Sequence, residues 1–283
     1  MGCEQGLPVP VALLRDDHAE PSVFRPEDLL REARRQRSLA AGSMPGVCLL
    51  DPDGDVVRFL QQTGRGRRSE TWACYHTDLW ETKAAGIPIG VVGNAVGAPF
   101  AVLVAEELVA SGCRLVVSVT SAGRLDPDRS LPKTILVDRA LRGEGTSHAY
   151  LPTGRYVEGD AGLLAAVARE LRRSGIDAVR GGTWTTDAPF RETRSAIAAA
   201  TAAGLKAVEM EAAGLYAFAR ARGTPVVSFA LITNEMAQIG DDFEKGADNG
   251  APHALALAAA AARGWQSLHG VVEAAQTAGI HDG

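Results

Sequence analysis

Short runs of apolar residues alternate with longer helical stretches from residue 47 almost to the end of the chain. Strands this short and this apolar are typical of a sheet that is buried on both faces, and the segments between them can supply the cover. The alternation therefore predicts one α/β domain of three layers, with helices on both sides of a central sheet that is mixed or mainly parallel. The predicted strands are Val47–Leu50, Ile87–Val92, Leu115–Val119, Thr134–Val137 and Val226–Thr233.

Helices are predicted where apolar residues recur at helical spacing, in several cases with a glycine just beyond the last turn. The first lies in an N-terminal arm, residues 1–45, and the rest belong to the domain of residues 46–283. No internal repeat or proline-rich linker divides the chain. The predicted helices are Pro26–Leu39, Phe100–Ser111, Ala161–Ser174, Glu192–Ala203, Glu211–Arg222 and Pro252–Leu268.

Composition excludes several classes of function. The formal net charge of −5 gives no general attraction to a phosphate backbone, which disfavours a nucleic-acid partner. The sequence contains neither an apolar stretch long enough to span a membrane nor a secretory pattern at the N-terminus, so we expect a cytoplasmic protein with a small-molecule substrate.

The four cysteines, Cys3, Cys48, Cys74 and Cys113, lack metal-type or redox-type spacing and are expected to be reduced and buried.

Two glutamates flank a methionine in the segment Ala207–Tyr216, where a short apolar run meets a predicted helix. Such a junction lies at the carboxyl edge of a sheet, where α/β proteins bind ligands. A carboxylate can accept hydrogen bonds from two adjacent sugar hydroxyls while a thioether packs against the ring. Periodicity alone favours the alternative, in which Glu209 and Glu211 are solvated charges at the start of a helix.

The residues Val208–Ala213, Val-Glu-Met-Glu-Ala-Ala, resemble the signature of nucleoside phosphorylase family I, which includes purine nucleoside phosphorylases, uridine phosphorylases and methylthioadenosine nucleosidases. Two more segments follow the family's order and spacing. Gly93–Gly97 resembles its glycine-rich turn, and Leu115–Gly123 resembles its central strand and Ser/Thr-Gly turn. The resemblance covers about residues 45–270, and the order of its segments is closest to uridine phosphorylase.

This resemblance implies a nucleoside phosphorylase-like fold and an enzyme that cleaves the N-glycosidic bond of a nucleoside. Orthophosphate is the co-substrate in the phosphorylases, and no other cofactor is implied. In the family the methionine and the second glutamate of the signature hold the ribose, which implies these roles for Met210 and the catalytic Glu211. Glu209 is also expected near the sugar.

The segment Gly182–Thr193 matches the family's base pocket in placement, with Asp187 near the usual acid. Phe190 can stack on a heterocycle, and Arg191 or Glu192 can hydrogen bond to its polar edge. The alternative is that Phe190 belongs to the core and Arg191 to the start of a surface helix.

Asn234, at the end of the last predicted strand, occupies the position of the aspartate that protonates the purine in purine phosphorylases and nucleosidases. Asparagine cannot serve as that acid. It resembles the residue of uridine phosphorylases, which favours a pyrimidine nucleoside and a catalytic, base-contacting Asn234. Glu235 follows where that branch usually has an arginine, which weakens a specific assignment to uracil.

The phosphate site departs from the family. The family's Gly-Asp-Pro-x-Arg loop corresponds to Leu50–Gly54 in this sequence, which keeps Asp51 but lacks the arginine. Two further carboxylates are added, Asp53 within the loop and Asp55 just beyond it. Ser118 aligns with a second phosphate-binding arginine. Because carboxylates repel a phosphate dianion, other cations are needed.

Ser121 and the turn amides around it can donate hydrogen bonds to an anion. Arg124, just after Gly123, is one candidate cation. Arg68 falls near the arginine that relatives supply from a neighbouring subunit. Either arginine could equally be a solvated surface charge.

Three functions remain open on the sequence: a phosphorylase with a rebuilt anion site, a nucleosidase that uses water, and a nucleoside-binding regulatory protein without activity. Relatives complete each sugar pocket with a residue of the adjacent subunit, which implies a homo-oligomer, either a hexamer or a dimer. The candidate donors are His18 and His76, although a surface histidine is the more frequent explanation.

Overall fold

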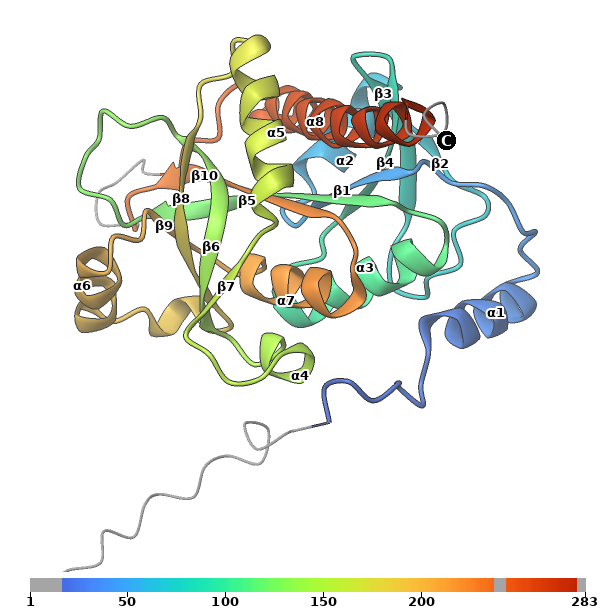
Figure 1. Cartoon of the computed structure of the whole chain (residues 1–283), viewed down its shortest axis with the longest axis horizontal. Coiled ribbons are helices and arrows are strands. Elements are labelled where there is room, and N and C mark those ends of the chain that lie inside the picture. The colour runs from blue at the N-terminus through green and yellow to red at the C-terminus, as the bar shows by residue number, and fades with distance from the viewer. Residues whose placement is uncertain (1–16, 237–242, 279–283) are drawn as a thin grey trace, which may run out of the picture.

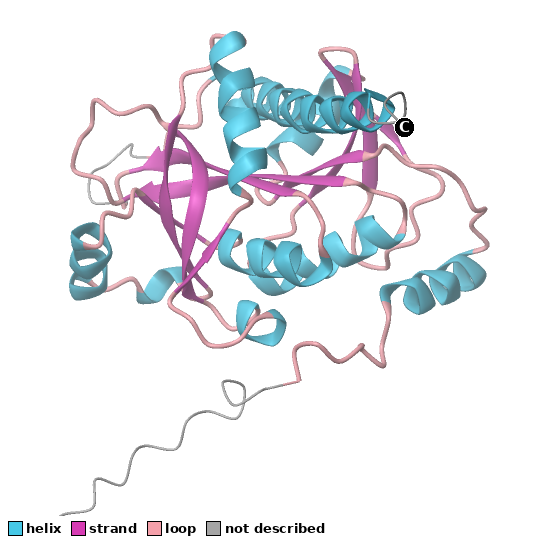
Figure 2. Cartoon of the chain, viewed as in Figure 1, coloured by secondary structure: helices cyan, strands magenta, loops and turns pink. Residues whose placement is uncertain are grey.

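The computed structural model describes residues 17–236 and 243–278 of the 283-residue chain. Within these residues, one mixed sheet of ten strands carries helices on both faces, as the sequence predicts (Figures 1 and 2). The strands are β1 (Val47–Asp51), β2 (Arg67–Arg68), β3 (Leu79–Ala84), β4 (Ile87–Gly93), β5 (Leu115–Arg124), β6 (Thr134–Gly143), β7 (Tyr156–Glu158), β8 (Val179–Thr186), β9 (Ala207–Glu209) and β10 (Val226–Asn234). The helices are α1 (Pro26–Arg37), α2 (Asp55–Thr63), α3 (Ala98–Ala110), α4 (Ser147–Tyr150), α5 (Ala161–Arg173), α6 (Arg194–Ala202), α7 (Ala212–Arg222) and α8 (Ala251–Ala278), with 3-10 turns at Pro189–Arg191 and Ala247–Gly250.

Part of the sheet closes on itself. β10 runs parallel to β5 and antiparallel to β6, and β6 continues through β8 and β9 back to β5. On the open side, β1 and β4 extend the sheet in parallel with β5. The strands β1, β4, β5 and β10 therefore all end at one edge of the sheet, and the short strand β9 returns to that edge beside β5.

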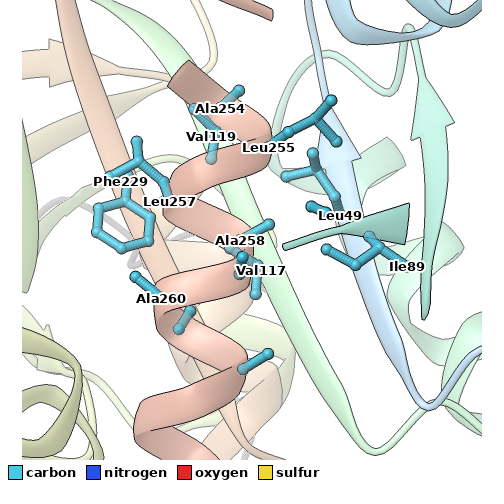
Figure 3. Packing of buried hydrophobic residues seen from close by; sticks show 14 of the residues in the cluster. Leu49, Ile89, Val117, Val119, Phe229, Ala254, Leu255, Leu257, Ala258 and Ala260 are labelled. Carbon is cyan, nitrogen blue, oxygen red and sulfur yellow. The ribbon is translucent and has the colours of Figure 1, made fainter. Parts of the chain in front are cut away.

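Two apolar layers hold the helices to the sheet. In the first, α2, α5 and α8 pack on one face, and Figure 3 shows Leu255, Leu257 and Ala258 of α8 over Val117 and Phe229 of the strands. The second layer places α3 and α7 on the opposite face. Side chains alternate along a strand, so Ser118 and Thr120 of β5 share the α7 side, whereas Ser121 points to the α8 side.

The five predicted strands and six predicted helices are all present, but β5, β6 and α8 extend five, six and ten residues beyond their predicted ends. β8 is absent from the sequence prediction because its residues, Val-Arg-Gly-Gly-Thr-Trp-Thr-Thr, carry few apolar side chains. Two of them, Thr183 and Thr185, are nevertheless fully buried because their hydroxyls bind a buried carboxylate. α2 is also missed, and it begins within the acidic loop after β1.

In the N-terminal arm, α1 packs Leu30 and Ala33 against Ala73 and Ala110. The division at residue 45 stays a prediction. Cys48, Cys74 and Cys113 are buried free thiols, as expected, and Cys3 lies outside the described residues. No helix within residues 17–236 and 243–278 is both long and apolar enough to cross a membrane.

Candidate functional site

Glu211 lies between β9 and α7, at the edge where the parallel strands end. Its side chain is 1% exposed. One carboxylate oxygen, Oε1, accepts a 2.7 Å hydrogen bond from the backbone N–H of Gly97. The other, Oε2, is buried and has no hydrogen-bond partner among the residues that the structure describes. Since a buried polar atom without a partner is costly, Oε2 marks a position where a ligand can donate a hydrogen bond.

The surroundings of Glu211 disfavour its charge. Burial is the main cause that raises the pKa of its carboxyl to about 8, and the charges of Glu209 and Asp53 act in the same direction. The Gly97 N–H and the Thr120 hydroxyl oppose this effect. A ligand that donates hydrogen bonds to the carboxylate adds to that opposition and favours the ionised form.

Gly97 makes the close approach to Glu211 possible. Its φ of 84° and ψ of 149° are open to glycine and strained for other residues. The turn Gly93–Gly97 thus presents a backbone N–H at the start of α3. Met210 lies beside it, because its methyl carbon is 4.0 Å from the point where a Cβ on Gly97 would stand.

Glu209 is held quite differently from Glu211. Its Oε1 accepts from the hydroxyls of Thr183 and Thr185, at 3.0 and 2.5 Å. Its Oε2 accepts from the backbone N–H groups of Glu211 and Ala212, both at 2.7 Å. The structure therefore brings all three residues of the sequence motif together, and within it Glu211 carries the unpartnered oxygen.

The acidic loop after β1 lies on the other side of the same edge. The Ser121 hydroxyl donates a 2.5 Å hydrogen bond to Oδ2 of Asp53. Lys245 reaches the same carboxylate at 3.2 Å and Asp55 at 2.6 Å. Burial is the main cause that raises the pKa of the neighbouring Asp51 to about 6. These residues line a cavity of about 540 Å³ that extends toward the start of α8.

The sequence did not single out Lys245, and no local signal could have revealed it, because the contact joins residues 190 positions apart. Thr120 was likewise missed. It is buried at the end of β5 on the side of Glu211, and it reads in the sequence as an ordinary strand residue.

The three candidate phosphate residues are not brought together. Ser121 lines the cavity, but Arg124 is 9% exposed and forms a 2.9 Å ion pair with Glu235. Arg68 lies two strands beyond β4, exposed and paired with Asp78 at 2.6 Å. Ser118 is buried in the middle of β5.

The candidate base-contacting residues divide into two groups. Asn234 ends β10 beside Gly123, with its Oδ1 accepting from the backbone N–H of Met236 at 2.9 Å. Phe190 and Arg191 lie in the 3-10 turn after β8, and the Phe190 side chain is fully exposed rather than part of the core. Glu192 follows half-buried, and burial raises the pKa of its carboxyl.

Asp187 and the two candidate histidines contact other parts of the same chain. Asp187 accepts a 2.9 Å hydrogen bond from the backbone N–H of Gly145. His18 lies 3.1 Å from the carbonyl oxygen of His148. His76 is exposed, and its ring packs edge-on against Phe100 of α3. In the part of the chain that the structure describes, no cluster of three or more histidine, cysteine or acidic side chains could hold a metal ion.

A family model described as the phosphorylase superfamily matches residues 47–263, which is most of the chain. The chain belongs to the phosphorylase superfamily. Among its curated relatives, a uridine phosphorylase of Thermococcus kodakarensis is 27% identical over 217 residues, covering 66% of this chain and 78% of the relative. A DeoD-type purine nucleoside phosphorylase of Myxococcus xanthus is 30% identical over 205 residues, covering 70% of this chain and 86% of the relative.

The fold of this superfamily member also resembles solved structures. A crystal structure of AMP nucleosidase from Bacteroides thetaiotaomicron superposes with a TM-score of 0.66 at 18% identity and covers 87% of this chain and 99% of that one. The predicted fold class is thereby confirmed. Because the relatives carry names for both pyrimidine and purine substrates, the comparisons leave the base open.

Proposed function

We propose that this superfamily member cleaves the N-glycosidic bond of a nucleoside, with Glu211 as the catalytic residue that holds the pentose. The observation that carries the proposal is the buried Oε2 of Glu211, which lacks a partner at the sheet edge where α/β proteins bind ligands. Adjacent sugar hydroxyls can donate to this carboxylate while Met210 packs against the ring. Its negative charge also favours the oxocarbenium-like character that the sugar gains as the bond breaks.

Asn234 is the residue proposed to contact the departing base. Its Oδ1 is occupied by the N–H of Met236, whereas its amide nitrogen has two N–H donors, of which one reaches Thr233 Oγ1 at 3.4 Å. A donor stabilises the charge that develops on a carbonyl oxygen of a leaving pyrimidine. The Asn234 amide cannot supply the proton that a leaving purine takes up, so we propose a pyrimidine nucleoside as the substrate. We also propose that Phe190, Arg191 and Glu192 lie near its base.

Orthophosphate is the nucleophile expected from the sequence, and the product is then a pentose 1-phosphate. Ser121 faces the cavity in which the anion would bind, and the cations that line it are Lys133 and Lys245. To bind there, phosphate must displace the Asp53 carboxylate from Ser121 and Lys245. Its binding also places a dianion beside the acids at positions 51, 53 and 55.

Water is a second candidate nucleophile, and the contact between Asp53 and Ser121 specifically favours it. A carboxylate at this position repels phosphate but can accept a proton from an attacking water. The expected products are then the free base and the free pentose. A nucleoside-binding protein without activity is the third outcome.

A panel of pyrimidine and purine nucleosides, assayed with and without orthophosphate, distinguishes the three outcomes. Base release that requires phosphate and yields pentose 1-phosphate supports phosphorolysis. Release of free pentose in phosphate-free buffer supports hydrolysis. Nucleoside binding without base release identifies a binding protein, and the absence of both binding and release refutes the proposal.

We also propose that the chain self-associates as a dimer or hexamer in the cytoplasm. Two exposed apolar side chains belong to the turn before α3 and to α3 itself, namely Val96, next to Gly97, and Leu103. Tyr75 is also exposed, and the neighbouring His76 ring packs against Phe100 of α3. A second copy that covers this face would bring its own side chains toward the pentose. Light scattering coupled to size-exclusion chromatography measures the assembly, and a monomer at assay concentrations refutes it.

A further inference from the structure

The carboxylate of Glu209 has no acceptor position left for a ligand. A carboxylate accepts about four hydrogen bonds, and Glu209 receives two from β8 hydroxyls and two from the backbone at the start of α7. The group is 3% exposed, and both threonines are fully buried. A sugar hydroxyl could contact this carboxylate only by displacing one of these donors.

One hydroxyl connects three parts of the site. Thr185 Oγ1 donates to Glu209 and accepts a 3.0 Å hydrogen bond from the backbone N–H of Ala213. The first N–H groups of a helix have no partner within the helix, and Glu211 itself provides no side-chain cap for α7. Glu209 and Thr185 therefore bind the consecutive N–H groups of Glu211, Ala212 and Ala213.

This arrangement fixes the backbone from which the Glu211 side chain extends toward Gly97. It also connects the sugar site to the segment expected to contact the base, because Thr186, the next residue of β8, accepts from the N–H of Ala188 at 3.1 Å. The 3-10 turn with Phe190 begins directly after it.

We propose that Thr185 and Glu209 are positioning residues that set the reach of Glu211 toward the pentose, and that Glu209 is not itself a sugar ligand. The inference rests on the proposed function of Glu211. It predicts that the loss of the Thr185 hydroxyl weakens the recognition of sugar hydroxyls more than it weakens the fold.

Thr185→Val replaces the hydroxyl by a methyl group of similar size, and Thr185→Ser keeps the hydroxyl. Thr183→Val is the matched control, because Thr183 also donates to Glu209, whereas the printed hydrogen bond to the start of α7 comes from Thr185. The readout is the ratio of kcat/KM for a ribonucleoside to that for its 2′-deoxy analogue, together with the melting temperature. If Thr185→Val costs Glu211 one charge-assisted hydrogen bond to a sugar hydroxyl, kcat/KM for the ribonucleoside should fall about 10- to 100-fold.

The expected result is that the ribo to deoxy ratio falls in Thr185→Val, recovers in Thr185→Ser and changes less in Thr183→Val. A general loss of stability would lower kcat/KM equally for both substrates and leave their ratio unchanged. An unchanged ratio in Thr185→Val would therefore overturn the inference. If Thr185→Val retains the wild-type ratio while Glu211→Gln is inactive, the positioning role fails and the proposed function stands.

If the wild-type chain cleaves no nucleoside, the proposed function fails, and a crystal structure of Thr185→Val still tests the positioning role. Displacement of the Glu211 carboxylate from the Gly97 N–H supports it. An unchanged contact overturns it.

Discussion

Replacing Glu211 by glutamine should abolish most activity while stabilising the protein at alkaline pH. The carboxyl titrates near 4.5 in an unfolded chain and near pH 8 in the folded protein. Between these values the unfolded state has lost its proton and the folded state still holds it, so stability falls as the pH rises. Above pH 8 the full penalty is reached, up to about 5 kcal/mol at about 1.4 kcal/mol for each pH unit between the two values.

Glutamine removes this penalty because it carries no charge. Its amide oxygen can still accept from Gly97, while its NH₂ group lacks a partner and costs about 1–3 kcal/mol. The variant should thus be about 2–4 kcal/mol more stable than wild type at pH 9 and no more stable at pH 5. Its kcat/KM for a nucleoside should fall about 10²- to 10³-fold, since neutral hydrogen bonds replace charge-assisted ones.

Urea unfolding at pH 5, 7 and 9 measures the first effect, and base release measures the second. Glu170→Gln is a suitable control, because Glu170 is a buried acid that pairs with Arg173 at the far end of α5. The kcat/KM of the wild type should rise with pH through about 8 as Glu211 ionises. Equal stability of wild type and Glu211→Gln at all three pH values, or retained turnover, would refute the reasoning.

Three further variants test the surroundings of the site. Asp53→Asn should lower hydrolysis by roughly 10²-fold or more if Asp53 accepts a proton from water, and should instead lower the KM for phosphate if phosphate is the nucleophile; unchanged kinetics would exclude both roles. Asn234→Asp introduces an acid and should shift the preference toward purine nucleosides at low pH, which competition between uridine and inosine measures; an unaltered preference would argue against base contact. Arg124→Ala breaks the ion pair between the buried Arg124 and Glu235, whose side chain is 30% exposed, and should therefore cost about 1–3 kcal/mol in urea unfolding, less than a fully buried pair, without changing the phosphate response; a raised phosphate requirement would restore Arg124 as an anion ligand.

The layers of the fold could be predicted from the sequence because the short apolar runs are the strands that lie buried between the two layers of helices. The strand β8 could not be predicted, since its buried face carries Thr183 and Thr185, whose hydroxyls donate to a carboxylate from another strand. A polar residue that is buried through a tertiary partner leaves no apolar signal in its own segment.

The site shows the same division. Glu209, Met210 and Glu211 are contiguous, so the motif marks their place at the sheet edge, but it does not show which glutamate keeps an unpartnered oxygen. That difference depends on the two threonines of β8 and on Gly97, which are remote in sequence. The ion pairs of Arg124 and of Lys245 are also set by tertiary contacts, and both alter the electrostatics of the expected anion site.

A crystal structure of the chain soaked with a pyrimidine nucleoside or an inert analogue tests the role of Glu211 most directly. The predicted result is a pentose whose adjacent hydroxyls lie within hydrogen-bond distance of Glu211 Oε2, with Met210 against the ring and Glu209 still bound to its four donors. A nucleoside bound elsewhere, with Oε2 of Glu211 untouched, would contradict the assignment of this edge as the site of cleavage.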